Sequence, residues 1–117
     1  MKIETSITIP DNLFRGNSLD IGVLVNLNLE NYKIRAEFFD QFYSNINLAT
    51  SNAGGSNDEI EVTDEDSGEF TIHIAKNLTT NFHLISFLEI ELEDADGKVQ
   101  TIYFSSIKFQ DNIYYRA

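Results

Sequence analysis

Alternation between hydrophobic and polar residues, with a period of two, runs through most of the chain. Its clearest instance is residues 31–39, where Ile34, Ala36 and Phe38 are separated by charged residues. A period of two places successive side chains on opposite faces of a β-strand, so this pattern predicts a strand with one buried face. The same alternation predicts further strands within residues 3–9, 19–25, 46–48, 60–62, 70–74, 88–92 and 98–109.

The last of these segments departs from strict alternation. The residues in phase with one another on its predicted inner face are Val99, Thr101, Tyr103, Ile107 and Phe109. Ile102 and Phe104 are out of phase with this set. The break predicts either a strand covered on both faces or a β-bulge.

Turn residues separate the predicted strands. Asp94 to Gly97 predicts a hairpin turn, residues 63–68 predict a second turn, and residues 76–82 predict a single helical turn that crosses between sheets. Short strands bounded by turns are typical of two packed antiparallel sheets with Greek-key connections. We therefore predict an all-β fold, an immunoglobulin-like antiparallel β-sandwich of seven or eight strands, with residues 1–117 forming a single domain.

Composition narrows the possible ligands. The chain has 117 residues, 42% of them hydrophobic, which is enough for one compact core. Its formal net charge of -11 disfavours nucleic acid and anionic membrane surfaces as partners. The longest apolar cluster, residues 84–88, is too short to span a bilayer, and the start of the chain does not resemble a signal peptide. No cysteine is present, which excludes disulfides and thiol catalysis and fits synthesis in a reducing cytoplasm.

Three candidate chemical sites have simpler structural interpretations. The glycine-rich loop SNAGGSND, residues 51–58, precedes a predicted strand and carboxylates, so we expect a turn and no phosphate site. The acidic stretch at residues 58–69 has the oxygen ligands that calcium prefers but lacks the spacing of a calcium loop, so we expect solvated turns and no bound metal or cofactor. His73 is out of phase with the core, and neither His73 nor His83 accompanies a nucleophile motif, so we expect no enzyme activity.

Several framework motifs, taken in order, resemble a known family. They are GNSLDIGVLV, NYKIRAEFFD, the long stretch that ends in GEFTIHIAKNLTTNF, and LEIELEDADGKVQTIYFSSIKFQD. Small immunoglobulin-like domains of phage virion proteins carry similar runs, and the N-terminal domain of the baseplate upper protein family looks most similar. The resemblance extends from Ile7 to about Phe109 and concerns framework positions.

This resemblance implies a non-enzymatic structural protein that is synthesised in the host cytoplasm and built into a virion. Its expected partners are other virion proteins or further copies of itself, with no nucleic acid or membrane involved. Because the sequence ends soon after the sandwich pattern, we expect a small accessory component of the head, neck or tail and baseplate, without a receptor-binding extension.

Two groups of aromatic residues are candidate interaction sites. Tyr114, Tyr115 and Arg116 follow the strand pattern, and tyrosines at a chain end are common interface anchors, although this tail could also fold back on its own sheet. Phe39, Phe42 and Tyr43 are the second group. Their simplest interpretation is an edge strand that packs onto the core, and the alternative is a platform for carbohydrate or another cell-surface group.

Overall fold

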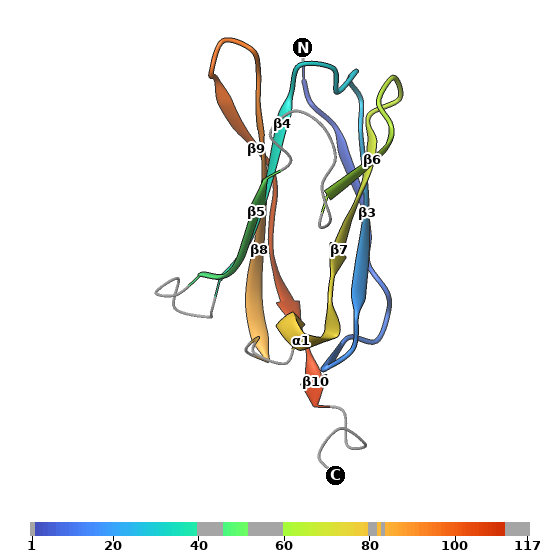
Figure 1. The fold of residues 1–117 in the computed structure, drawn as a ribbon, viewed down its shortest axis with the longest axis vertical. Coiled ribbons are helices and arrows are strands. Elements are labelled where there is room, and N and C mark those ends of the chain that lie inside the picture. The colour runs from blue at the N-terminus through green and yellow to red at the C-terminus, as the bar shows by residue number, and fades with distance from the viewer. Residues whose placement is uncertain (1, 40–45, 52–59, 80–81, 83, 112–117) are drawn as a thin grey trace.

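The strands form two four-stranded antiparallel sheets that face each other (Figure 1). The computed structural model describes residues 2–39, 46–51, 60–79, 82 and 84–111. The first sheet has the order β1 (Thr5–Thr8), β3 (Leu19–Val25), β7 (Glu69–Ile74) and β6 (Ile60–Asp64). The second sheet has the order β5 (Ile46–Ser51), β4 (Lys33–Phe39), β8 (Ile85–Glu93) and β9 (Val99–Lys108). The predicted all-β, sandwich-like fold is confirmed.

Three small elements complete the described chain. The helical turn α1 (Lys76–Thr79) follows β7 and precedes β8, so it lies where the chain passes from the first sheet to the second, as predicted (Figure 1). β2 (Phe14–Arg15) and β10 (Gln110–Asp111) pair in parallel at the end of the molecule where α1 lies. The alternation did not predict this pair, because two residues are too few to show a period.

The core lies between the two sheets and is built from the inward side chains of their strands. These buried side chains include Ile21, Val23, Ile34, Phe38, Phe70, Ile72, Leu88, Ile90 and Leu92. Beyond the strands, Phe82 is 1% exposed; its ring stacks on Phe38 at a centroid distance of 4.8 Å and meets Phe109 edge-on at 5.6 Å. The period-two assignment of inward positions is confirmed for β3, β4, β7 and β8.

β9 corrects one part of the sequence prediction. Ile90 pairs with Tyr103, but the next residue of β8, Glu91, pairs with Thr101, so Ile102 is an extra residue in β9. The bulge shifts the phase of the strand, and Val99 and Thr101 are therefore exposed, not inward as predicted. Of the two alternatives that the sequence left open, a strand covered on both faces or a bulge, the structure shows the bulge.

Two hairpin turns each contain a glycine with positive φ, in surroundings that differ. Gly68, in the β6–β7 turn, has a φ of 81°, and its carbonyl accepts a hydrogen bond of 2.9 Å from the Val25 amide. A Cβ atom at Gly68 would lie 2.1 Å from the Val25 carbonyl oxygen and 2.5 Å from that of Leu27. Gly97, in the β8–β9 turn, has a φ of 85° and no heavy atom within 4 Å of the corresponding position. The first turn is thus packed against the chain that leaves β3, whereas the second stands clear.

Candidate functional site

Three phenylalanines from neighbouring strands form an aromatic strip on the outer face of the second sheet. Phe87 of β8 lies between the buried residues Ser86 and Leu88, so its side chain points outward. Phe39 of β4 is its direct cross-strand partner. On the other side, the Phe104 ring of β9 stacks on the Phe87 ring, with centroids 5.8 Å apart and planes at 18°. The aromatic strip, Phe39, Phe87 and Phe104, therefore runs across β4, β8 and β9.

The strip leaves a large apolar area in contact with water. Phe104 is 47% exposed, and Ile85, which points outward from β8 beside the strip, is 43% exposed. Phe39 and Phe87 are half-buried. Adjacent exposed apolar side chains mark interaction surfaces more often than isolated ones do, because their removal from water favours association.

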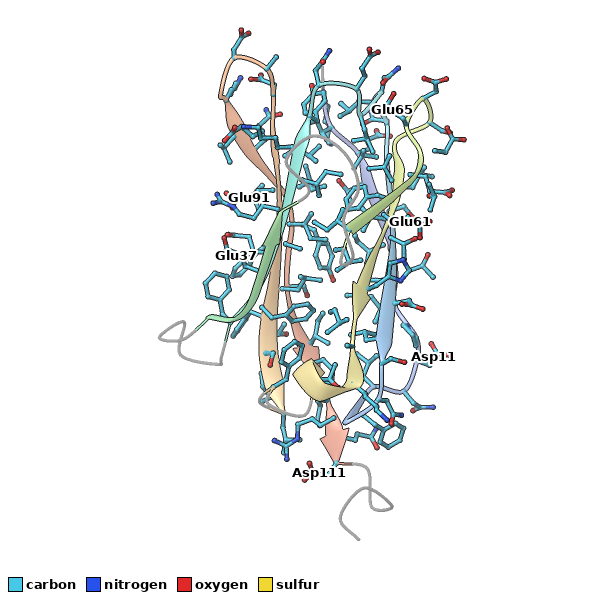
Figure 2. The ribbon with its side chains drawn as sticks, viewed as in Figure 1. Asp11, Glu37, Glu61, Glu65, Glu91 and Asp111 are labelled. Atoms are coloured by element: carbon cyan, nitrogen blue, oxygen red, sulfur yellow. The ribbon has the colours of Figure 1, made fainter. Side chains whose placement is uncertain are left out.

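A group of carboxylates borders the strip on the same face. Glu37 and Glu89 are cross-strand partners, and Glu91 lies opposite Arg35. The guanidinium of Arg35 contacts Glu91 at 2.9 Å and Glu37 at 3.3 Å. Figure 2 shows Glu37 and Glu91 on the outer side of the second sheet. Their side chains are only 17% exposed or less, so this part of the face holds negative charge that is partly removed from water.

Glu89 is the member of this group that lies nearest the strip, because Phe104 is its cross-strand partner on β9. Partial burial raises the pKa of Glu89, and repulsion from Glu91 and Glu37 raises it further. Glu89 has no ion-pair partner among the described residues. Attraction from Arg35 lowers this pKa in part, and a further cation brought to this position would favour the charged form of Glu89 more.

The aromatic strip and the glutamates beside it together suit contact with another macromolecule. An apolar strip bordered by carboxylates is complementary to a surface that combines apolar side chains with Lys or Arg. Neither protein-family models nor curated protein sequences give a match to this chain.

The candidate interaction residues have different outcomes. Phe39 belongs to the aromatic strip, on a strand inside the sheet and not on an edge strand as its simplest interpretation held. Phe42, Tyr43, Tyr114, Tyr115 and Arg116 lie outside the described residues. Phe87 was not among the residues predicted from the sequence, and Phe104 was not assigned to a site. The signal for Phe104 was its position out of phase with the core face of β9.

The outer face of the first sheet carries a different arrangement, centred on His73. Its Nδ1 lies 2.8 Å from an Asp20 carboxylate oxygen on β3, and its Nε2 lies 2.9 Å from a Glu61 carboxylate oxygen on β6. Hydrogen bonds to Asp20 and Glu61 raise the pKa of His73 above its usual value. Both ring nitrogens contact neighbouring strands, so His73 links β3, β7 and β6 on the outer face, in line with its position out of phase with the core. His83 lies outside the described residues.

The described part of the acidic stretch forms β6, the first residue of β7 and the turn between them, and side chains of the stretch itself hold this turn. An Asp64 carboxylate oxygen accepts a hydrogen bond of 3.2 Å from the Ser67 amide, and Thr63 donates one of 2.7 Å to Glu69. Hydrogen bonds from the Ser67 side chain and amide lower the pKa of Asp64. Among the described residues no group of three or more histidine, cysteine, aspartate or glutamate side chains could hold a metal ion. Residues 52–59, which include most of the glycine-rich loop, lie outside this part of the chain.

In the residues that the structure describes, no helix has the length and apolar character needed to cross a membrane.

Proposed function

We propose that the protein is a non-enzymatic structural component of a phage virion, a small accessory protein with an immunoglobulin-like fold. It docks to the head, neck or tail and baseplate through protein–protein contacts and is present there in repeated copies. It is synthesised in the host cytoplasm, and its partners are other virion proteins.

The strand order supports the immunoglobulin-like part of the proposal. Immunoglobulin domains pair their strands A, B, E and D in one sheet and C, F and G in the other, with C′ added beside C in some types. Assigned in chain order, β1, β3, β7 and β6 take the places of A, B, E and D. β5, β4, β8 and β9 take those of C′, C, F and G. The resemblance to virion domains of this class rests on the same segments.

The docking role rests on one observation: the aromatic strip lies beside the three glutamates Glu37, Glu89 and Glu91 on the same face. Burying the strip against another protein removes exposed apolar area from water, at about 25 cal/mol for each Å². The three glutamates favour a partner with basic residues at this position, which gives selectivity. His73 supports the non-enzymatic part, because both of its ring nitrogens are engaged by neighbouring strands.

A carbohydrate-binding or cell-surface-binding module is the second candidate, since aromatic rings beside carboxylates are also found in saccharide sites. Saccharides stack on an open ring face. Here Phe87 and Phe104 stack on each other, so each ring has one face covered. Binding of the isolated protein on a glycan array, lost in Phe104→Ser, would favour this candidate.

Incorporation into particles tests the virion role. Purified particles from cells producing the tagged protein are analysed by quantitative mass spectrometry for wild type, Phe104→Ser and Leu24→Ser. Leu24 is the matched control, because it is 46% exposed and lies on β3 of the first sheet. We expect a defined copy number for wild type and Leu24→Ser and a strong reduction for Phe104→Ser. Absence of the wild-type protein from particles would refute the proposal.

The C-terminal residues Tyr114, Tyr115 and Arg116 supply a second test of the same role. Deletion of residues 112–117 should leave the thermal unfolding temperature nearly unchanged and abolish incorporation into particles, because tyrosines at a chain end are common interface anchors. If the protein that lacks residues 112–117 still incorporates at full copy number, these residues are not anchors.

A further inference from the structure

β9 is an unusual edge strand. It is ten residues long, it is the outermost strand of the second sheet, and no strand of the described residues pairs along its other side. Its sequence, VQTIYFSSIK, contains no acidic residue, and Lys108 is its only charged residue. In a chain with a net charge of -11, this is a long segment without negative charge.

The other edge strands are shorter or charged. β1 has four residues, and β6 has five residues that include Glu61 and Asp64. β5 has six residues and adjoins segments outside the described residues. Natural edge strands are usually short, charged or interrupted by proline, because an open row of backbone groups recruits another strand. β9 has the bulge at Ile102 and a single charge, Lys108 at its end, to limit such pairing.

Beyond the bulge, the side chains of β9 alternate regularly. Tyr103, Ser105 and Ile107 pair with inward residues of β8, whereas Phe104 and Ser106 pair with the outward residues Glu89 and Phe87. Lys108 pairs with Ile85 and points outward as well. A second strand can therefore add to residues 104–108 without a mismatch between inner and outer faces.

We infer that β9 pairs with β9 of a second copy of this chain, antiparallel and about a two-fold axis at Ser106, so that two sheets join into one. A two-fold axis makes the same surface serve both partners, which requires that surface to be complementary to itself. This inference goes beyond the proposed function, since it concerns the purified protein alone.

Charge and side-chain type favour a second copy of this chain as the partner of β9, and they favour the axis at Ser106. With the axis at Ser106, Phe104 of each copy lies opposite Lys108 of the other copy. A lysine ammonium beside a phenyl ring gains cation–π attraction. Glu89 lies on the far side of Phe104, on β8, and has no ion-pair partner among the described residues. Each copy thus brings a lysine to the Phe104 side chain of the other copy, on the face that carries Glu89.

Pairing about an axis one residue away, at Ser105, is less complementary. An axis at Ser105 would place Lys108 opposite Ile102, the bulge residue, where the alternation of faces breaks down. It would also remove Lys108 from Phe104. The axis at Ser106 instead brings two small serine side chains together, which lets the strands approach closely.

Sedimentation velocity of the purified protein across a dilution series tests the association. We expect a monomer–dimer equilibrium for wild type. Ser106→Asp and Ser106→Lys each place two like charges opposite one another at the axis and should weaken dimerisation at least about tenfold. Because Ser106→Lys makes the net charge less negative, weakening by both variants separates local repulsion from the overall charge of the protein.

Ser6→Asp is the matched control. Ser6 is an exposed serine on β1, the edge strand of the first sheet, and the substitution adds the same charge as Ser106→Asp. It should dimerise like wild type. Two results would overturn the inference: a wild-type protein that stays monomeric at every concentration, or a dimer that neither Ser106 variant weakens. In the first case, the edge of β9 would be available for a strand of another protein.

Cysteine cross-linking tests the register, and the absence of native cysteine makes it unambiguous. Directly opposed Cα atoms of antiparallel strands lie about 4.5–5.5 Å apart, within disulfide range. Ser106→Cys should therefore form a covalent dimer rapidly under mild oxidation. Ser105→Cys, whose two copies would be diagonal neighbours at about 7–8 Å, should cross-link far more slowly. Faster cross-linking at Ser105 would refute the proposed axis.

Discussion

The two sheets have equivalent inner faces and very different surroundings. Both contribute alternate, fully buried aliphatic and aromatic residues to one core. The first sheet has a hairpin turn packed against the chain at Gly68 and an outer face linked across three strands by His73. The second has a free-standing turn at Gly97, an aromatic strip and an edge strand, β9, that pairs with no further strand of the described residues. The same alternation of hydrophobic and polar residues therefore builds both sheets. The sheets differ in how much apolar surface and unpaired strand edge they present for contact with other molecules.

The largest expected effect concerns the two hairpin turns. In Gly68→Ala the added Cβ would overlap two backbone carbonyl oxygens, which cannot move without displacing the end of β3. We expect a loss of at least about 4 kcal/mol in the free energy of unfolding, or failure to fold.

Gly97→Ala is the control for this effect. It has nearly the same φ and open space around it, so only the cost of a left-handed backbone remains, about 1–2 kcal/mol. Urea denaturation of both variants measures the difference. Equal losses would mean that the first turn is not packed as described.

The next effect tests the equivalence of the two inner faces. Ile72 and Ile90 are both 0% exposed and lie on inner strands of the first and second sheets. Truncation of either to alanine should cost about 2–5 kcal/mol through lost burial and a residual cavity. Chemical denaturation should give values of similar size. A large loss at only one of them would show that the core depends mainly on one sheet.

A smaller effect is expected from the outer face of the second sheet. Arg35→Met keeps most of the side-chain volume and removes the cation that Glu37 and Glu91 share. We expect a loss of about 1–2 kcal/mol at neutral pH, since these carboxylates keep their burial but lose a charged hydrogen-bond partner. Lys33→Met is the control: its contact with Glu93 is longer, 3.7 Å, and more exposed, so its removal should be nearly neutral.

The smallest effect is the pH dependence of the link on the first sheet. The pKa of His73 is raised above 6.5 in the folded protein, so the protonated form stabilises the fold at pH values below 6.5. This stabilisation is lost as the pH rises through the folded-state pKa. Because the His73 side chain is 38% exposed, solvent screening keeps the contribution below about 1 kcal/mol.

His73→Gln measures this contribution. The unfolding temperature of the variant should fall below that of wild type at acidic pH, and the gap should close as the pH rises. A gap that widened with rising pH would contradict the assignment of a stabilising protonated histidine.

The sequence predicted the inner faces well, because burial on one side of a strand imposes a period of two. Leu88, Ile90 and Leu92 show this directly. It failed at Val99 and Thr101, where one extra residue at the bulge reversed the faces. The aromatic strip could be anticipated only in part: Phe39 was a candidate, but its contact with Phe87 depends on the pairing of two strands distant in sequence. Local periodicity does not determine such a pairing.

The parallel pair β2–β10 was beyond the reach of any local pattern, and it sets the order in which the fold can be completed. Arg15 and Asp111, which the pair brings together with an Nε–Oδ1 distance of 2.8 Å, are 96 residues apart in sequence. Closing so long a loop early would cost more entropy than closing the hairpins. During synthesis, β2 must also wait until nearly the whole described chain has left the ribosome. We therefore expect the hairpins to form first and this end of the molecule to close last, once residues 110–111 are available to pair with β2.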